Sequence, residues 1–132
     1  MLYALLAYHQ ERVIQDLSEA EDADLMEDLE RVHGAWTKAG ALGPAARLGA
    51  TSLAATVRAG GLVTDGPFAE TKEHLLGFYV IDCPSREAAI TRARELQTAN
   101  PSAIYEVRPI VLFRPGAAIP ETDAGTELVR PG

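Results

Sequence analysis

The apolar residues of this chain form two kinds of pattern, unbroken short runs and a helical stripe. Residues 2–8 are one unbroken run of strand length, and residues 77–81 are another. Such runs are typical of strands that are buried on both faces. In the segment 19–39 the apolar residues instead recur every three or four positions, as on one face of a helix. These residues are Leu25, Leu29, Val32 and Trp36. The pattern therefore predicts two strands with a helix between them.

Local signals mark the ends of two helices. Ser18 and Glu21 have the spacing of a capping box, in which each side chain accepts a hydrogen bond from the backbone N–H of the other residue. Gly40 is placed to end this first helix, because glycine readily adopts the left-handed conformation found there. A second helix is expected to begin near Ser85 and to stop at Asn100, which precedes a proline.

The remaining segments are shorter. Residues 9–17 are polar and are predicted to form a loop, and residues 42–44 (LGP) a turn. Residues 52–58 and 62–64 have extended character and flank an Ala-Gly-Gly sequence, which predicts a hairpin. Residues 104–109 are predicted to form the last core strand.

The resulting order is strand, helix, strand hairpin, strand, helix, strand. This is a βαββαβ-like layout of the α+β class, and the split βαβ, ferredoxin-like sandwich satisfies it with both helices on one face of an antiparallel sheet. Because two strands are apolar on both sides, the other face of the sheet must be covered as well. A second copy of the chain is the simplest cover, so we predict a homodimer that packs sheet against sheet.

The composition is that of one globular domain. The chain has 132 residues, of which 47% are hydrophobic and 23% charged, and two independent cores would each be marginal at this length. We assign residues 1–111 to the domain. Residues 112–132 are rich in Gly, Pro and Ala and lack periodicity, which indicates a C-terminal extension.

The charge and the cysteine content narrow the choice of partners and compartment. The net charge is -7, and nine of the nineteen acidic residues lie between Glu11 and Glu30. Nucleic acids and anionic membranes bind basic protein surfaces, which an acidic chain lacks. We therefore expect neither a nucleic acid nor a membrane as a partner. With one cysteine, Cys83, no internal disulfide can form, and no apolar window reaches the length of a membrane span. A cytoplasmic location is therefore expected.

The densest group of ionisable residues follows the predicted hairpin. Asp65, Glu70, Lys72 and Glu73 lie within nine residues, beside an aromatic residue and a backbone restrained by proline. Asp-Gly is a common turn signal, so a plain turn is one interpretation. A functional loop is the other, because a cleft at this point would raise the pKa of a carboxyl group enough for proton transfer.

The sequence of residues 65–73, DGPFAETKE, followed by GFYVID at 77–82, resembles the DGPF subgroup of the YCII-related proteins. Residues 106–109 are also similar to the end of that family's domain, and the resemblance covers residues 1–111. It implies a dimeric α+β barrel with a ferredoxin-like fold. Most members lack an assigned function, although some relatives are thought to use a His and Asp pair and one branch is a dehydrochlorinase acting on a chlorinated aromatic. DGPF members often occur beside, or fused to, sigma factors of the extracytoplasmic-function type.

Two residues outside this run are further candidates. His33 lies at the border of the helical stripe, where it is either a packing residue or an acid–base group that titrates near neutral pH. Arg108, on the last strand, would be costly inside a barrel unless it binds an anion or pairs with a carboxylate such as Glu106. His9 is expected at a strand end, where barrel clefts often open, as a residue of the following loop, and His74 in the same cleft as the DGPF run or in solvent. Three scattered histidines and one cysteine have no metal-ligand spacing, so neither a metal nor another cofactor is expected.

Two functional hypotheses stay open. The first is a small-ligand-binding or regulatory protein, with a sigma factor as a candidate partner. Its candidate ligand-binding residues are Phe68, Lys72, Glu73 and Arg108. The alternative is a cofactor-independent lyase or isomerase that acts on a small organic substrate, an aromatic one included. Its candidate catalytic residues are Asp65, His33 and Glu70. A purely structural brace over residues 65–73 is the third interpretation.

Overall fold

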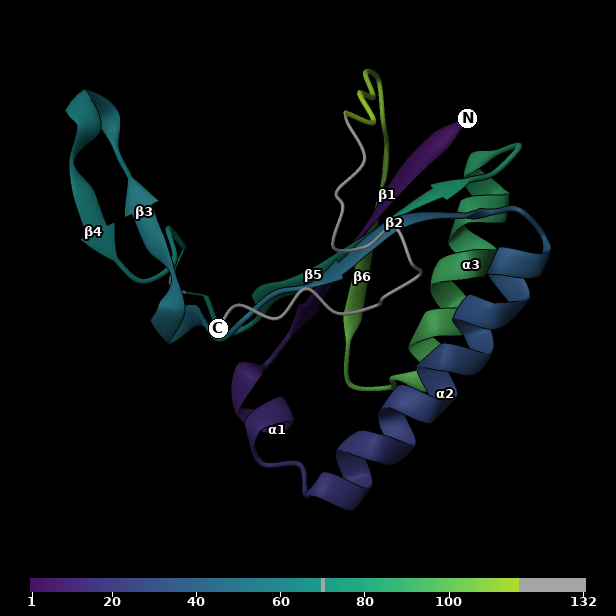
Figure 1. The fold of residues 1–132 in the computed structure, drawn as a ribbon, viewed down its shortest axis with the longest axis horizontal. Coiled ribbons are helices and arrows are strands. Elements are labelled where there is room, and N and C mark those ends of the chain that lie inside the picture. The colour runs from purple at the N-terminus through teal and green to yellow at the C-terminus, as the bar shows by residue number, and fades with distance from the viewer. Residues whose placement is uncertain (70, 117–132) are drawn as a thin grey trace.

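The computed structural model describes residues 1–69 and 71–116 of the chain. A four-stranded antiparallel sheet is covered on one face by two helices, α2 (Glu19–Lys38) and α3 (Arg86–Ala99) (Figure 1). In spatial order the strands of this sheet are β2 (Leu42–Arg47), β5 (His74–Asp82), β1 (Leu2–His9) and β6 (Ile104–Pro109).

The strand order confirms the predicted ferredoxin-like sandwich. β1 pairs antiparallel with both β5 and β6, and β5 pairs antiparallel with β2. The segments containing α2 and α3 therefore each connect two parallel strands that have a third strand between them, which is the split βαβ arrangement.

The core lies between the sheet and the two helices. Leu5 from β1, Ile81 from β5, Trp36 from α2 and Leu96 from α3 are its largest fully buried side chains. Burying one such aliphatic side chain contributes about 1.5–3 kcal/mol. The stripe predicted on the first helix is confirmed, because two of its members are buried and the other two pack against the core while partly exposed.

The predicted helix ends are also confirmed. Ser18 Oγ accepts a hydrogen bond from the Glu21 N–H at 3.1 Å, and the Glu21 carboxylate accepts one from the Ser18 N–H at the same distance. Gly40 follows α2 with a φ of +69°, in the left-handed region. Ser85 caps α3 by accepting a hydrogen bond from the Ala88 N–H at 3.1 Å.

Two predicted irregular segments form regular structure instead. Residues 42–44 belong to the edge strand β2, and the short helix α1 (Glu11–Gln15) lies within the predicted loop 9–17. Five of the six residues of β2 are exposed, and its sequence, LGPAAR, has no alternation of apolar and polar residues. A register shift between Leu42 and Ala45 accommodates the intervening proline. Pairing with β5, rather than local propensity, makes this segment a strand.

The predicted hairpin exists, but it is not part of the main sheet. Strands β3 (Ala55–Val57) and β4 (Val63–Asp65) form a separate two-stranded sheet that projects from the body (Figure 1). We call residues 55–65 the arm. A 3-10 turn (Thr51–Leu53) precedes it, and a second one (Ala59–Gly61) forms its tip, where the two glycines have positive φ.

The sheet has a second face, which α2 and α3 do not cover, and we call it the open face. Its apolar side chains are half-buried in the single chain: Leu2, Ala4, Leu6, Tyr8, Phe78 and Val80. The central strands are therefore apolar on both faces, as predicted. Of the predicted extension, residues 112–116 are exposed and residues 117–132 lie outside the described part of the chain. Within the described residues, no helix combines the length and apolar character that crossing a bilayer requires.

Gly77 provides a test of how closely β5 packs on β2. A Cβ at this position would lie 2.8 Å from the backbone oxygen of Ala46. We expect Gly77→Ala to lower the free energy of unfolding by about 1–3 kcal/mol, because the two strands must separate. Urea denaturation measures this change.

Gly34 supplies the matched control. It lies in α2, and a Cβ added there would have no heavy atom within 4 Å beyond its own stretch of helix. Gly34→Ala should therefore raise the free energy of unfolding by about 0.5–1 kcal/mol through better helix propensity. Similar effects of the two substitutions would contradict the close approach of β5 and β2.

Candidate functional site

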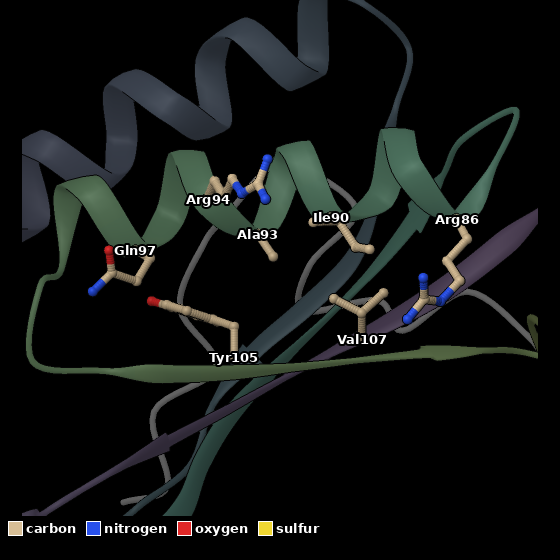
Figure 2. A pocket seen from close by; sticks show the side chains of 7 residues that line it. All are labelled: Arg86, Ile90, Ala93, Arg94, Gln97, Tyr105 and Val107. Carbon is tan, nitrogen blue, oxygen red and sulfur yellow. The ribbon is translucent and has the colours of Figure 1, made fainter.

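A groove lies between α3 and β6 (Figure 2). None of the predicted site residues that the structure describes lines this groove. These residues instead lie on or beside the arm, between α2 and β5, and on β6.

The Asp-Gly-Pro bend fixes the base of the arm. Asp65 is exposed at the end of β4, where it is opposite Ala55. Gly66 has a φ of +92°, which favours glycine. Its N–H donates to the Ala54 carbonyl at 2.7 Å, and its carbonyl accepts from the Thr56 hydroxyl at 2.9 Å. The turn interpretation of this segment therefore has a structural basis.

The described residues in the rest of the DGPF run are exposed or half-buried. Phe68 is 74% exposed, and the Arg58 guanidinium lies 5.4 Å from its ring centroid. Lys72 is exposed and Glu73 is half-buried. Glu70 lies outside the described residues. Arg58 of the arm and Phe68 beside its base thus present a cation and an aromatic ring together, an arrangement suited to contact with a partner.

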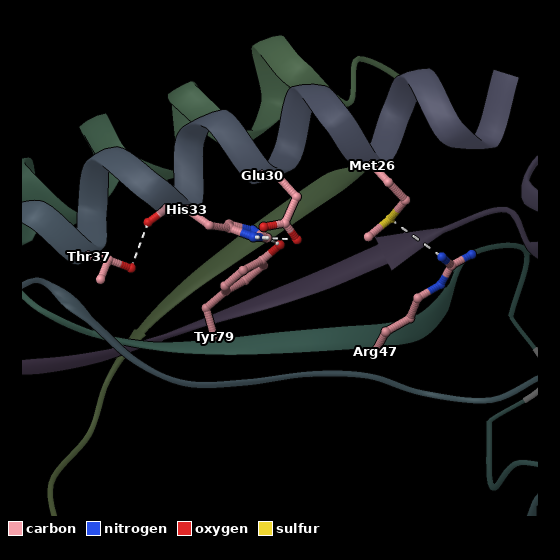
Figure 3. A network of polar contacts seen from close by, with 6 residues as sticks. All are labelled: Met26, Glu30, His33, Thr37, Arg47 and Tyr79. Carbon is pink, nitrogen blue, oxygen red and sulfur yellow. Dashed lines mark hydrogen bonds and ion pairs between the residues drawn. The ribbon is translucent and has the colours of Figure 1, made fainter. Parts of the chain in front are cut away.

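His33 belongs to a chain of polar groups between α2 and β5 (Figure 3). Its Nε2 lies 2.9 Å from the Tyr79 hydroxyl oxygen, and its Nδ1 lies 3.9 Å from the Glu30 carboxylate. Burial lowers the pKa of His33, while the charge of Glu30 acts in the opposite direction. Burial also raises the pKa of Tyr79. At neutral pH the imidazole of His33 is therefore uncharged, and the Tyr79 hydroxyl keeps its proton.

We call these three residues the Glu30–His33–Tyr79 relay, in which a carboxylate, an imidazole and a hydroxyl follow one another; the contact with Glu30, at 3.9 Å, is longer than a hydrogen bond. Trp36 packs beside it, with its ring centroid 6.3 Å from that of His33 and 5.9 Å from that of Tyr79. The His33 side chain is 20% exposed, so the imidazole is not sealed from solvent. The same contacts hold α2 against β5.

Arg47 is a further cation on this side of the sheet. Its guanidinium lies 3.6 Å from the Met26 sulfur (Figure 3). It also lies 3.7 Å from the Asp22 carboxylate, so Arg47 connects β2 to α2. Neither Arg47 nor Tyr79 was predicted as a site residue from the sequence. Tyr79 is two residues before the buried Ile81, so both side chains lie on the helix side of β5. This spacing is the sequence signal that could have placed Tyr79 near a helix residue such as His33.

Arg108 pairs with Glu106 as predicted, with 2.9 Å between Nε and the carboxylate oxygen. Both side chains are on the surface, 67% and 45% exposed, rather than inside a barrel of the single chain. Arg108 is opposite Ala4 on the open face, whereas His33 contacts the helix side. Asp65, His33 and Arg108 consequently lie in three different places and do not form one pocket.

His9 lies at the end of β1 and is 3% exposed, so its predicted place in a loop is wrong. Its Nδ1 is 3.0 Å from the Gln10 carbonyl, and its Nε2 is 2.8 Å from the Ser102 hydroxyl. His74 is its neighbour across the strands, and Nδ1 of His74 is buried without a hydrogen-bond partner in the described structure.

Glu11 connects this end of the sheet to the root of the arm. Its carboxylate accepts hydrogen bonds from the Thr51 N–H at 2.7 Å and from the Thr51 hydroxyl at 2.6 Å. These bonds lower the pKa of Glu11. Among residues 1–69 and 71–116, no three His, Cys, Asp or Glu side chains are grouped so as to hold a metal ion.

Sequence comparison gives the relationship of this chain. The profile of the YCII-related domain matches residues 1–114. The chain belongs to the YCII-related domain family. An uncharacterized protein of Rhizobium meliloti (strain 1021) is 52% identical over 120 residues, which cover 88% of this chain and 97% of that protein. The YCII-related relationship predicted from the sequence is confirmed, and the arm and the relay are two features of this YCII-related fold.

The lowered pKa of His33 predicts how stability depends on pH. In the unfolded chain His33 titrates near its ordinary value of 6.5, so below that pH the unfolded state binds more protons than the folded state. The free energy of unfolding should therefore fall as the pH decreases through this value. His33→Gln should reduce the fall measured by urea denaturation between about pH 7.5 and pH 5.5.

NMR titration of the imidazole checks the cause directly. The pKa of His33 should lie below 6.5, and Glu30→Gln should lower it further because the protonated imidazole loses a nearby negative charge. A His33 pKa at or above 6.5, or an equal loss of stability in wild type and His33→Gln, would contradict the buried neutral imidazole.

Proposed function

We propose that this YCII-related chain is a homodimeric binding or regulatory domain whose arm docks on the second copy. The arm projects from the body (Figure 1), and the exposure of its apolar side chains there carries this proposal. Val57 and Val63 are opposite one another across the arm and are 71% and 59% exposed, and Leu62 beside them is 61% exposed. A lone two-stranded hairpin is marginally stable in water, so these side chains favour a covered position.

The open face of the sheet supports the same assembly. Leu6 and Phe78 are neighbours across β1 and β5 on this face, and both are half-buried in one chain. In a symmetric dimer each copy buries the same surface, so one apolar face is enough to form the interface. The resemblance to dimeric α+β barrels favours this sheet-to-sheet contact.

The separation of the titratable groups favours binding or regulation over catalysis. A general acid or base must be within hydrogen-bond reach of the atom it serves. Asp65 on the arm and His33 beside β5 do not share such a position within one chain. A small ligand, or a sigma factor suggested by the DGPF resemblance, fits this role. The acidic segment 11–30 offers an anionic surface to a basic partner.

Disruption of the arm tests the dimer. The double substitution Val57→Asp/Val63→Asp places two charges on the apolar side of the arm, and we expect it to convert a dimer into a folded monomer. Light scattering coupled to size-exclusion chromatography measures the mass, and circular dichroism measures the fold.

Val13→Asp is the matched control, since Val13 is 38% exposed on α1, away from the arm, and this variant should stay dimeric. A wild-type chain that is monomeric at every concentration would refute the proposal, as would a dimer that both sets of substitutions leave intact.

The second candidate function is cofactor-independent lyase or isomerase chemistry, and the Glu30–His33–Tyr79 relay favours it. In the tautomer with its proton on Nδ1, His33 would accept the Tyr79 hydroxyl proton at Nε2, while the Tyr79 oxygen would take a proton from a small organic substrate. Asp65 would contribute only if an arm reached the relay of another subunit.

Chloride release from a panel of chlorinated aromatic compounds tests this chemistry. Where wild type releases chloride, His33→Gln should lower the rate by about 10²–10⁴-fold, the usual contribution of an acid–base group. Arg31→Gln, on an exposed side of the same helix, should leave the rate unchanged. The absence of turnover, or full activity in His33→Gln, would leave binding or regulation as the function.

A further inference from the structure

The groove between α3 and β6 is open to solvent along its outer side. Its volume is about 390 Å³. Ile90 and Ala93 line it from α3 and Val107 from β6, so its middle is apolar. β6 is an edge strand of the sheet, and no further strand of the described chain closes the outer side of the groove.

Two cations border the groove. Figure 2 shows Arg86 at one end, beside Val107, and Arg94 on the helix above. Neither arginine forms an ion pair with a carboxylate of the described residues, whereas Arg92 on the same helix lies 3.5 Å from the Glu95 carboxylate.

The position of Arg86 is unfavourable for the helix itself. It is the first residue of α3, where the helix dipole disfavours a positive charge. The chain as a whole has a net charge of -7, so each of the two arginines is a local positive charge on an acidic molecule. Such a site is complementary to an anion.

The other end of the groove is polar and uncharged. Gln97 and Tyr105 face one another there (Figure 2). Burial raises the pKa of Tyr105, so its hydroxyl keeps a proton that it can donate, while it accepts a hydrogen bond from Asn100 Nδ2 at 3.4 Å. Gln97 Nε2 donates to the Pro101 carbonyl at 2.8 Å, which holds the amide and leaves its oxygen free to accept.

We propose that this groove binds a small amphipathic carboxylate. The guanidinium of Arg86 or Arg94 binds the carboxylate in the bidentate manner that suits this pair. The apolar body lies over Ile90, Ala93 and Val107, and a polar group on a longer ligand reaches Tyr105. This inference names a ligand class for the ligand-binding role proposed above and rests on that role.

Titration of octanoate into the full chain tests the proposal. Calorimetry should give saturable binding, and amide shifts in NMR spectra should cluster on α3 and β6. Octan-1-ol, which has the same body without the charge, and inorganic phosphate, which has the charge without the body, should each bind more weakly.

The double substitution Arg86→Gln/Arg94→Gln should weaken octanoate binding by about tenfold or more, because it removes the charged partners of the carboxylate. Arg12→Gln is the matched control, since Arg12 lies exposed on α1 and the change in net charge per site is the same. The single substitution Arg94→Gln is measured as well. If the double variant folds poorly, weaker octanoate binding by the single variant still tests the proposal.

Several results would overturn the proposal. These are octanoate that does not saturate by about 10 mM, amide shifts centred outside α3 and β6, or unchanged affinity in the arginine variants. The mass of each variant is measured in parallel. If octanoate does not bind although the chain is a dimer, the groove proposal fails and the dimer proposal stands. If the arm substitutions leave the dimer intact, the dimer proposal fails and the groove proposal is judged by octanoate binding alone.

Discussion

The burial of one face of the central strands β1 and β5 beneath α2 and α3 is the constraint on which the rest of the molecule depends. Leu5, Ile81 and Trp36 meet in this layer and are fully buried. Successive side chains of a strand point to opposite faces, so fixing this layer also fixes which residues form the open face. The same layer sets the relay, because Tyr79 lies on the helix side of β5 and His33 lies one turn before Trp36 on α2. A shift of one residue in the strand register would dismantle the core and the relay together.

The arm is an insertion between β2 and β5 that the core does not hold. Its tip depends on glycines with positive φ, and its base depends on Gly66 and on the bonds between Glu11 and Thr51. The DGPF run and the relay both contain ionisable side chains. Because the arm projects from the core, these two groups of residues are not in contact within one chain. The fold gives them different positions, one on a projecting surface and one at a helix–sheet contact. The groove beside β6 is a third position, and it arises where α3 crosses the edge of the sheet.

Prediction from the sequence succeeded where the signal is local. The capping box at Ser18, the glycine that ends α2 and the helical stripe are all set by residues a few positions apart. The pair of Glu106 and Arg108 was also predictable, since residues two apart on a strand share a face. His33 was identified as a candidate, but its partner Tyr79 is 46 residues away, and no spacing rule connects them.

The sequence by itself therefore determined the class of the fold, the two long helices, the central strands and the bend at the base of the arm. The elements follow from the spacing of apolar residues and from capping and turn residues close together in the chain, and the fold class follows from the order of the elements. Only the tertiary structure decided that residues 42–47 are an edge strand, that the hairpin leaves the sheet, and that α3 and β6 enclose a groove with two arginines. These features depend on contacts between segments far apart in the chain, whose free energy is set by packing and pairing rather than by local propensity.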